Sequence, residues 1–283
     1  MLPTFLVIGA AKAGTTSLWA YLREHPQVFM SDPKELHFFV ADMNWGRGLP
    51  WYESHFEGAG DAIARGEACG AYARYPKHRA VPERIAEVVP EAKLIYLVRH
   101  PIERMISNYI LNVQLGVERE RSVERALLTD PQYVEASRYA MQLEQYLPYF
   151  APEKMLVIQS EDLSAGRSAA MERTFAFLGV DTSWVPDNLD QEYNITRAKV
   201  NRAVRPTARA VSRKLQRFPG YPALVSRVPA PVRNVKRQLA TREMAPVRTI
   251  SDAARRELED QLKPDVERLR DFMGAGFDGW GIA

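Results

Sequence analysis

Three short apolar runs stand out along the chain. They are TFLVIG at 4–9, KLIYLVR at 93–99 and MLVIQSEDL at 155–163. Continuous apolar runs of this length predict strands that are buried on both faces, as in a parallel sheet. Helix-type patterns lie between the runs, and this alternation favours a doubly wound α/β fold of the P-loop type, flanked by helices.

The helix-type patterns have clear limits. In the first, Leu18, Trp19 and Leu22 share one face, and the pattern stops before Pro26. Gly179 is the expected C-cap of the fourth. The predicted helices are 15–25, 102–115, 139–150, 169–178 and 252–273.

Residues 202–242 differ in composition from the rest. They hold eleven basic residues, five prolines and no acidic residue. One stretch within them has a helical apolar face, formed by Ala208, Val211, Leu215 and Phe218. We predict one domain over 1–283, with a basic helical insertion or lid at 202–245. This basic arm could cover the domain, bind an anionic acceptor or touch an anionic membrane surface.

The overall composition limits which cellular compartments and binding partners are expected for this protein. A net charge of +3 and a pI near 8.9 are too mildly basic to indicate a nucleic-acid partner. Cys69 is the single cysteine, so no disulfide can form within the chain. No apolar run approaches the roughly 20 residues of a membrane helix, and no signal peptide is recognisable. We expect a cytoplasmic protein, with peripheral membrane contact through the basic arm as an option.

The segment GAAKAGTTS, at 9–17, connects the first predicted strand to the first helix. A helix N-terminus offers unpaired N–H groups and the positive end of the helix dipole, both of which attract anions. Gly9 and Gly14 allow close backbone approach, and hydroxyl donors follow at Thr15, Thr16 and Ser17. The segment therefore predicts a phosphate-binding loop.

The lysine of this loop is not where a nucleotide triphosphatase has it. The motif G-x-x-x-x-G-K-[ST] would need lysine at 15, where the chain has threonine, and Lys12 lies inside the loop instead. This favours a donor with one transferable group next to its 5′-phosphate. A kinase or NTPase is an alternative, but it also predicts an acidic strand end where KLIYLVR ends in arginine. A non-catalytic nucleotide-binding protein is another, and it predicts no base near the loop.

The stretch KAGTTSL resembles the 5′-phosphosulfate loop of sulfotransferases that use 3′-phosphoadenosine-5′-phosphosulfate (PAPS). The resemblance implies that PAPS, leaving as adenosine 3′,5′-bisphosphate, is held by Lys12, Ala13, Gly14, Thr15, Thr16 and Ser17. The family's 3′-phosphate site has an arginine at a strand end and a serine eight residues later, which match Arg99 and Ser107. A guanidinium is a permanently charged, forked donor suited to phosphate.

A third stretch, EYNITRAKVNR at 192–202, resembles the loop that closes over the nucleotide in this family. Arg197, Lys199 and Arg202 are its candidates for binding phosphate. An ordinary solvated basic loop explains the same residues equally well.

The stretch SDPKELHFF, at 31–39, resembles glycosaminoglycan sulfotransferases of the heparan sulfate type. The resemblance implies that Glu35 takes the acceptor proton and that His37 supports it. His37 is the alternative base, and a surface pair with Lys34 is the non-catalytic alternative for Glu35. In-line transfer would need no metal, because the leaving phosphate is held by the loop and Lys12.

The resemblance covers most of 4–181, the final predicted helix and FDGW at 277–280, with a departure that bears on the acceptor. The heparan-type pattern EKTP is replaced by EACG at 67–70, so a lysine is missing, which argues against a glycosaminoglycan acceptor. We expect Cys69 to be a packing residue, and the acceptor to be a hydroxyl of a small molecule, glycan or glycolipid. Six aromatic residues could line the acceptor pocket or could equally belong to the core: Phe38, Phe39, Trp45, Trp51, Tyr52 and Tyr72.

Overall fold

Five parallel strands form one sheet in the computed structural model, which describes residues 1–191, 193, 249–274 and 276–283. The sheet order is β2-β3-β1-β4-β5. The strands are β1 (Phe5–Gly9), β2 (Val28–Met30), β3 (Ala64–Ala68), β4 (Lys93–Val98) and β5 (Met155–Gln159). This sheet confirms the predicted α/β class.

The three predicted strands are present, but β2 and β3 were missed. β2 has only three residues, which is too short to give an apolar run. β3 reads ARGEA, so charged residues interrupt its pattern although Glu67 is fully buried. Gly66 allows this strand to pair with β1, because an added Cβ would lie 2.1 Å from Cζ of the Phe5 ring.

All five predicted helices are found, with one clear change of bounds. They are α1 (Thr15–Glu24), α4 (Pro101–Leu115), α7 (Tyr139–Glu144), α9 (Arg167–Leu178) and α13 (Asp252–Met273). The prediction of 139–150 for α7 was too long, because Pro148 has no N–H and disfavours a continuous helix there. Gly179 has φ 80° and caps α9, as predicted.

Further short helices join these elements. They are α2 (Leu49–Ser54), α3 (Val81–Val88), α5 (Val123–Thr129), α6 (Pro131–Glu135) and α8 (Ser160–Ala165). Single 3₁₀ turns occur at Trp45–Arg47, Glu57–Ala59, Pro152–Lys154 and Gly279–Gly281. Only the first part of the third run is a strand: β5 ends at Gln159, and the chain turns into α8 at once.

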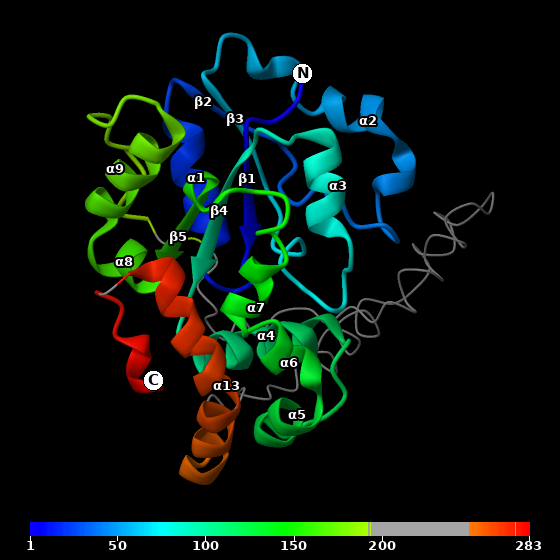
Figure 1. The fold of residues 1–283 in the computed structure, drawn as a ribbon, viewed down its shortest axis with the longest axis vertical. Helices are drawn as coiled ribbons and strands as arrows, with labels where there is room; N and C mark the ends of the chain where they lie inside the picture. Colours follow the sequence, from blue (N-terminus) through cyan, green and yellow to red (C-terminus); the bar gives the residue numbers. More distant parts are fainter. Residues whose placement is uncertain (192, 194–248, 275) are drawn as a thin grey trace, which may run out of the picture.

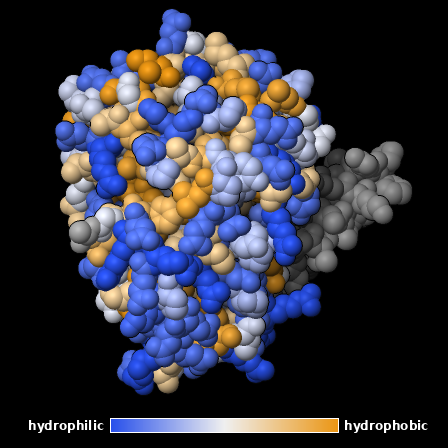
Figure 2. All heavy atoms as spheres, in the orientation of Figure 1, coloured by the Kyte–Doolittle hydropathy of each residue, from blue (hydrophilic) through white to orange (hydrophobic). Residues whose placement is uncertain are grey.

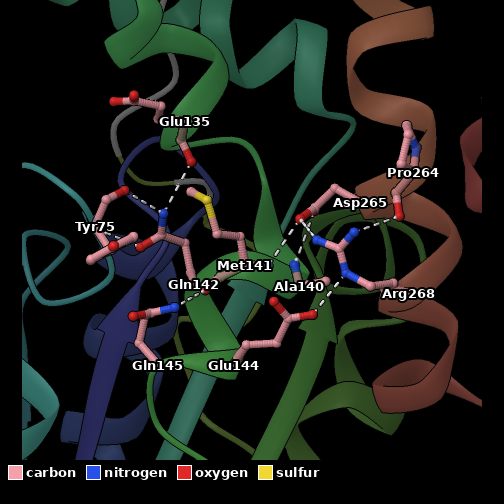
Figure 3. A network of polar contacts seen from close by, with 10 residues as sticks. All are labelled: Tyr75, Glu135, Ala140, Met141, Gln142, Glu144, Gln145, Pro264, Asp265 and Arg268. Atoms are coloured by element: carbon pink, nitrogen blue, oxygen red, sulfur yellow. Dashed lines mark hydrogen bonds and ion pairs between the residues drawn. The ribbon is translucent and has the colours of Figure 1, made fainter.

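The carboxyl ends of the strands point toward α4, α6 and α7, with α13 beside them (Figure 1). The packing of α13 on α7 is fixed by Asp265, whose buried carboxylate accepts the N–H groups of Ala140 and Met141 at 3.0 and 2.9 Å (Figure 3). Gln142, also on α7, accepts a hydrogen bond from the N–H of Tyr75 and donates one to the carbonyl of the same residue. The C-terminal helix thus anchors α7, and α7 anchors the segment that follows β3.

The face of the molecule seen in Figure 2 is mostly hydrophilic, with hydrophobic residues showing between the polar ones, chiefly in its upper half and across its centre. Among the described helices, none is both long and apolar enough to span a bilayer. The basic arm at 202–245 lies outside the described residues.

Candidate active site

The predicted phosphate-binding loop at 9–17 lies at the carboxyl end of the central strand β1. Gly14 has φ 96° and is the N-cap of α1, whose first turn holds no acidic residue. A side chain at this φ would be strained, so glycine suits the position. The first turn of α1 thus holds no carboxylate that would compete with an anion bound at the N-terminus of this helix.

Lys12 lies in this loop beside the end of β4. The Arg99 guanidinium donates to the Lys12 carbonyl at 3.5 Å, which places the two predicted phosphate ligands next to each other. Burial, then the charges of Arg99 and Lys34, lower the pKa of the Lys12 ammonium, and only Glu35 opposes this. Cationic side chains held this close repel each other, and an anion that binds between them stabilises their charged forms.

The hydroxyl groups of the loop have different surroundings. Thr15 accepts a hydrogen bond from Lys34 Nζ at 3.3 Å. Ser17 is hydrogen-bonded to the backbone of Tyr193, at the start of the segment expected to close over the nucleotide. Ser107 is buried in the second turn of α4. Arg197, Lys199 and Arg202 lie outside the described residues.

The predicted base residues lie in a loop over 34–38, called here the base loop. The Glu35 carboxylate is 2.9 Å from Lys34 Nζ and 3.7 Å from His37 Nε2. Its side chain is 42% exposed, whereas those of His37 and Lys34 are 23% and 13% exposed. Thr15, Lys34, Glu35 and His37 thus form a continuous chain of contacts from the phosphate-binding loop to the candidate base.

The contacts of His37 fit the predicted supporting role beside Glu35. Its Nδ1 is 3.2 Å from Cys69 Sγ, and burial raises the pKa of that thiol well above its usual value. A protonated thiol can donate to Nδ1, which leaves the proton of a neutral imidazole on Nε2, toward Glu35. Burial, opposed by Glu35, also lowers the pKa of His37.

Comparison with known proteins decides the family. A model of the sulfotransferase domain matches residues 2–220. The chain belongs to the sulfotransferase family. A human bifunctional heparan sulfate N-deacetylase/N-sulfotransferase 3 is 30% identical over 199 residues, which are 63% of this chain and 22% of that protein. Human heparan sulfate glucosamine 3-O-sulfotransferase 5 is 33% identical over 174 residues, 57% of this chain and 49% of that protein.

The chain thus spans from about a fifth to about half of these curated relatives. In three dimensions it is similar to a sulfotransferase from Alicyclobacillus acidocaldarius, with a TM-score of 0.71 and 24% identity over 99% of both chains. This likeness supports the P-loop-like fold of the family.

Two basic residues near the predicted site, Lys34 and Arg74, were not predicted as part of it. Lys34 was considered only as a surface partner of Glu35, but it is mostly buried and also reaches the phosphate-binding loop. Arg74 is half-buried, and its guanidinium has no hydrogen bond or ion pair within the described residues. Burial lowers the pKa of Arg74, while Tyr133 and Glu35 oppose this. In the sequence, Arg74 is marked only by being the one charged residue in the stretch GAYARYP at 70–76.

Most of the six aromatic residues that the sequence assigned to either the acceptor pocket or the core belong to the core. Phe38 stacks on Tyr52 with ring centroids 4.2 Å apart, and Phe39 and Tyr72 pack beside them. All four are at most 2% exposed. Trp45 and Trp51 are partly buried against this cluster. Cys69 is also fully buried and forms no disulfide, in accord with a packing role.

A separate cavity of about 190 Å³ opens between the segment after β3 and α7. Four tyrosines line it together with polar groups: Tyr72, Tyr75, Tyr146, Tyr149, His78, Glu83, Gln142, Glu144 and Gln145. It shares Tyr72 with the core beneath the base loop. Aromatic faces and amide or carboxylate groups of this kind suit a ring that carries hydroxyls.

Proposed function

We propose that this protein is a PAPS-dependent sulfotransferase that transfers the sulfuryl group to a hydroxyl of a small-molecule, glycan or glycolipid acceptor. The acceptor oxygen attacks sulfur in line with the departing phosphate, and the bond between sulfur and the bridging oxygen breaks. The acceptor proton goes to Glu35, and adenosine 3′,5′-bisphosphate leaves with the bonding electrons.

The contacts that join the phosphate-binding loop to the base loop carry this proposal. The hydrogen bond of Arg99 to Lys12 brings two cations to the donor side. The bonds of Lys34 to Thr15 and Glu35 bring a carboxylate to the same place. Sulfuryl transfer needs this combination, because charge develops on the leaving phosphate while the acceptor loses a proton.

Each donor-side residue has a distinct task in this proposal. Lys12 stabilises the bridging oxygen as negative charge builds on it, and the backbone N–H groups of 13–17 hold the 5′-phosphate. Arg99 and Ser107 hold the 3′-phosphate, which distinguishes PAPS from ATP. Arg197, Lys199 and Arg202 remain proposed additions from the closing segment. No step requires a metal ion.

On the acceptor side, Glu35 is the proposed base and His37 its support. The carboxylate is partly exposed and so can be reached by an incoming hydroxyl, whereas His37 is directed to Glu35 and Cys69. The heparan-type lysine is replaced by Ala68. Arg74, a cation without a partner among the described residues, lies within electrostatic influence of Glu35 and offers a different contact to the acceptor.

Ligand-dependent thermal stability tests the nucleotide part of this proposal. Adenosine 3′,5′-bisphosphate should raise Tm, and ATP with Mg²⁺ should raise it less, because a ligand that binds only the folded state stabilises it by mass action. Lys12→Ala is the matched variant and should lose most of the shift. A larger shift with ATP and Mg²⁺ would contradict the choice of donor.

Labelled PAPS tests the transfer itself. Incubation with cell extracts, followed by mass spectrometry of the sulfated products, should yield a product with the wild-type protein. The Lys12→Ala variant should yield far less of this product in the same time. Sulfation of nitrogen rather than oxygen would correct the proposed acceptor class.

A further inference from the structure

A fully buried carboxylate lies directly beneath the base loop. Glu67, on β3, is 0% exposed. It accepts hydrogen bonds from the hydroxyls of Tyr52 and Tyr72, both at 2.7 Å. The backbone N–H of Leu36, which lies between Glu35 and His37, also interacts with this carboxylate. The donor and the acceptor site proposed above make no direct use of Glu67.

The base loop has a backbone that needs external support. Glu35 has φ 65° and His37 has φ 52°, although neither is glycine. Left-handed backbone of this kind costs of the order of 1–2 kcal/mol for each non-glycine residue. Two such residues on either side of Leu36 would relax unless neighbouring groups held them in place.

Tyr72 transmits the effect of Glu67 to this loop. Its hydroxyl donates its only proton to Glu67 and at the same time accepts the N–H of Phe38 at 3.1 Å. An ionised carboxylate can only accept, so it fixes the direction of the tyrosine proton and leaves a lone pair for Phe38. Two bonds that do not depend on Glu67, from Glu35 N–H to the Ala68 carbonyl and from Asn44 to the Leu36 carbonyl, hold the rest of the loop.

We propose that Glu67 is a positioning residue whose carboxylate, through Tyr72 and Leu36, fixes the backbone that places Glu35 and His37, and that protonation of Glu67 weakens this hold. Its effect on catalysis rests on the function proposed above. The structural effect on the base loop does not.

The ionisation of Glu67 falls in a useful range of pH. Burial raises its pKa to about 7, while the bonds from Tyr52, Tyr72 and Leu36 oppose the rise and the charge of Glu35 adds to it. Of the other groups that face it, Tyr52, Tyr72 and Cys69 have pKa values raised well above their usual ones by burial. Glu67 therefore carries its charge above about pH 7, and the hold on the base loop is lost as the pH falls below it.

The amide resonance of Phe38 reports on this hold without any donor or acceptor. In protein labelled with ¹⁵N-phenylalanine, and with the resonance assigned through Phe38→Leu, the Phe38 amide should shift with an inflection near pH 7. Glu67→Gln should remove the inflection. Tyr72→Phe should also remove it, and this second variant keeps the test valid if Glu67→Gln does not fold.

Asp265→Asn is the matched control. Asp265 is also a buried carboxylate that accepts two backbone N–H groups, but it caps α7 rather than the base loop (Figure 3). This variant should leave the Phe38 inflection in place. A Phe38 shift that is flat between pH 6 and 8, or one that persists in Glu67→Gln, would overturn the proposal.

Kinetics then test the catalytic consequence. Glu67→Gln should lower kcat by about 10- to 100-fold at pH 8, a range typical of a misplaced catalytic group, with KM for PAPS changed less than twofold. Asp265→Asn should keep kcat. An unchanged kcat in Glu67→Gln would refute the positioning role, whereas failure of adenosine 3′,5′-bisphosphate to bind wild-type protein would refute the proposed function and leave the amide titration as a separate result.

Discussion

Replacing Glu35 by glutamine should separate catalysis from stability. The carboxylate is 2.9 Å from Lys34 Nζ, but its side chain is 42% exposed. Ion pairs exposed to this degree contribute about 0–1 kcal/mol to folding. The amide has the same shape and can still accept a hydrogen bond from Lys34. We therefore expect Tm to change by no more than about 2 °C.

Turnover should respond much more strongly. A glutamine amide cannot take the proton of the acceptor hydroxyl, and loss of a general base typically slows a reaction by about 10²- to 10⁴-fold. At 1.36 kcal/mol for each factor of ten, this corresponds to about 3–5 kcal/mol of transition-state stabilisation. Donor binding should be kept or become slightly tighter, because a negative charge close to Lys12 is removed.

The assay is transfer of ³⁵S from labelled PAPS to an acceptor identified in extracts, with adenosine 3′,5′-bisphosphate binding measured beside it. Glu91→Gln is the control, since it removes one carboxylate of an exposed pair with Lys154. If Glu35→Gln transfers sulfate within threefold of the wild-type rate, Glu35 is not the base. His37→Ala would then be the variant to examine.

Other variants and conditions address the rest of the molecule. Lys12→Ala should lower kcat by about 10²- to 10³-fold, as for loss of one group that stabilises developing charge, and a smaller loss measured in the same assay would weaken its role at the bridging oxygen. Gly66→Ala should destabilise the fold by about 3 kcal/mol, because its Cβ would lie 2.1 Å from the Phe5 ring, and thermal unfolding should show this as a Tm about 6 °C lower. EDTA should leave the rate of sulfate transfer unchanged, and a loss restored by Mg²⁺ would contradict a metal-free mechanism. Co-sedimentation with anionic liposomes at low salt should retain the protein if the basic arm at 202–245 contacts membranes, and absence of binding would remove that option.

Much of the donor side could be predicted from local sequence. A buried strand, a glycine-rich turn and a helix start are encoded within 4–25, and the structure forms them close to the predicted bounds. Arg99 follows directly on β4 for the same reason. The helix Asp252–Met273 was predicted with its observed bounds, and the structure shows Ser251 as its N-cap and Gly274 as its C-cap.

The parts that were missed depend on contacts between distant segments. β3 carries charged residues and was not recognised as a strand, because Glu67 is buried only by the neighbours that satisfy it, Tyr52 and Tyr72. From the sequence, Lys34 is expected on the surface, and only the folded structure shows that Thr15, on α1, accepts a hydrogen bond from it. Patterns in a short stretch of sequence cannot predict hydrogen-bond partners that come from distant segments.

The sequence by itself predicted the fold class and a phosphate-binding loop, because strands, helices and turns are set by residues that are close along the chain. It gave the candidate base residues through the resemblance of 31–39 to a known family. Only the tertiary structure decided that Lys12, Arg99, Lys34 and Glu35 share one place. It also decided that most of the candidate pocket aromatics are core residues. The physical reason is that burial and electrostatic partners are properties of the packed sheet, in which β1, β3 and β4 bring together residues that lie far apart in sequence.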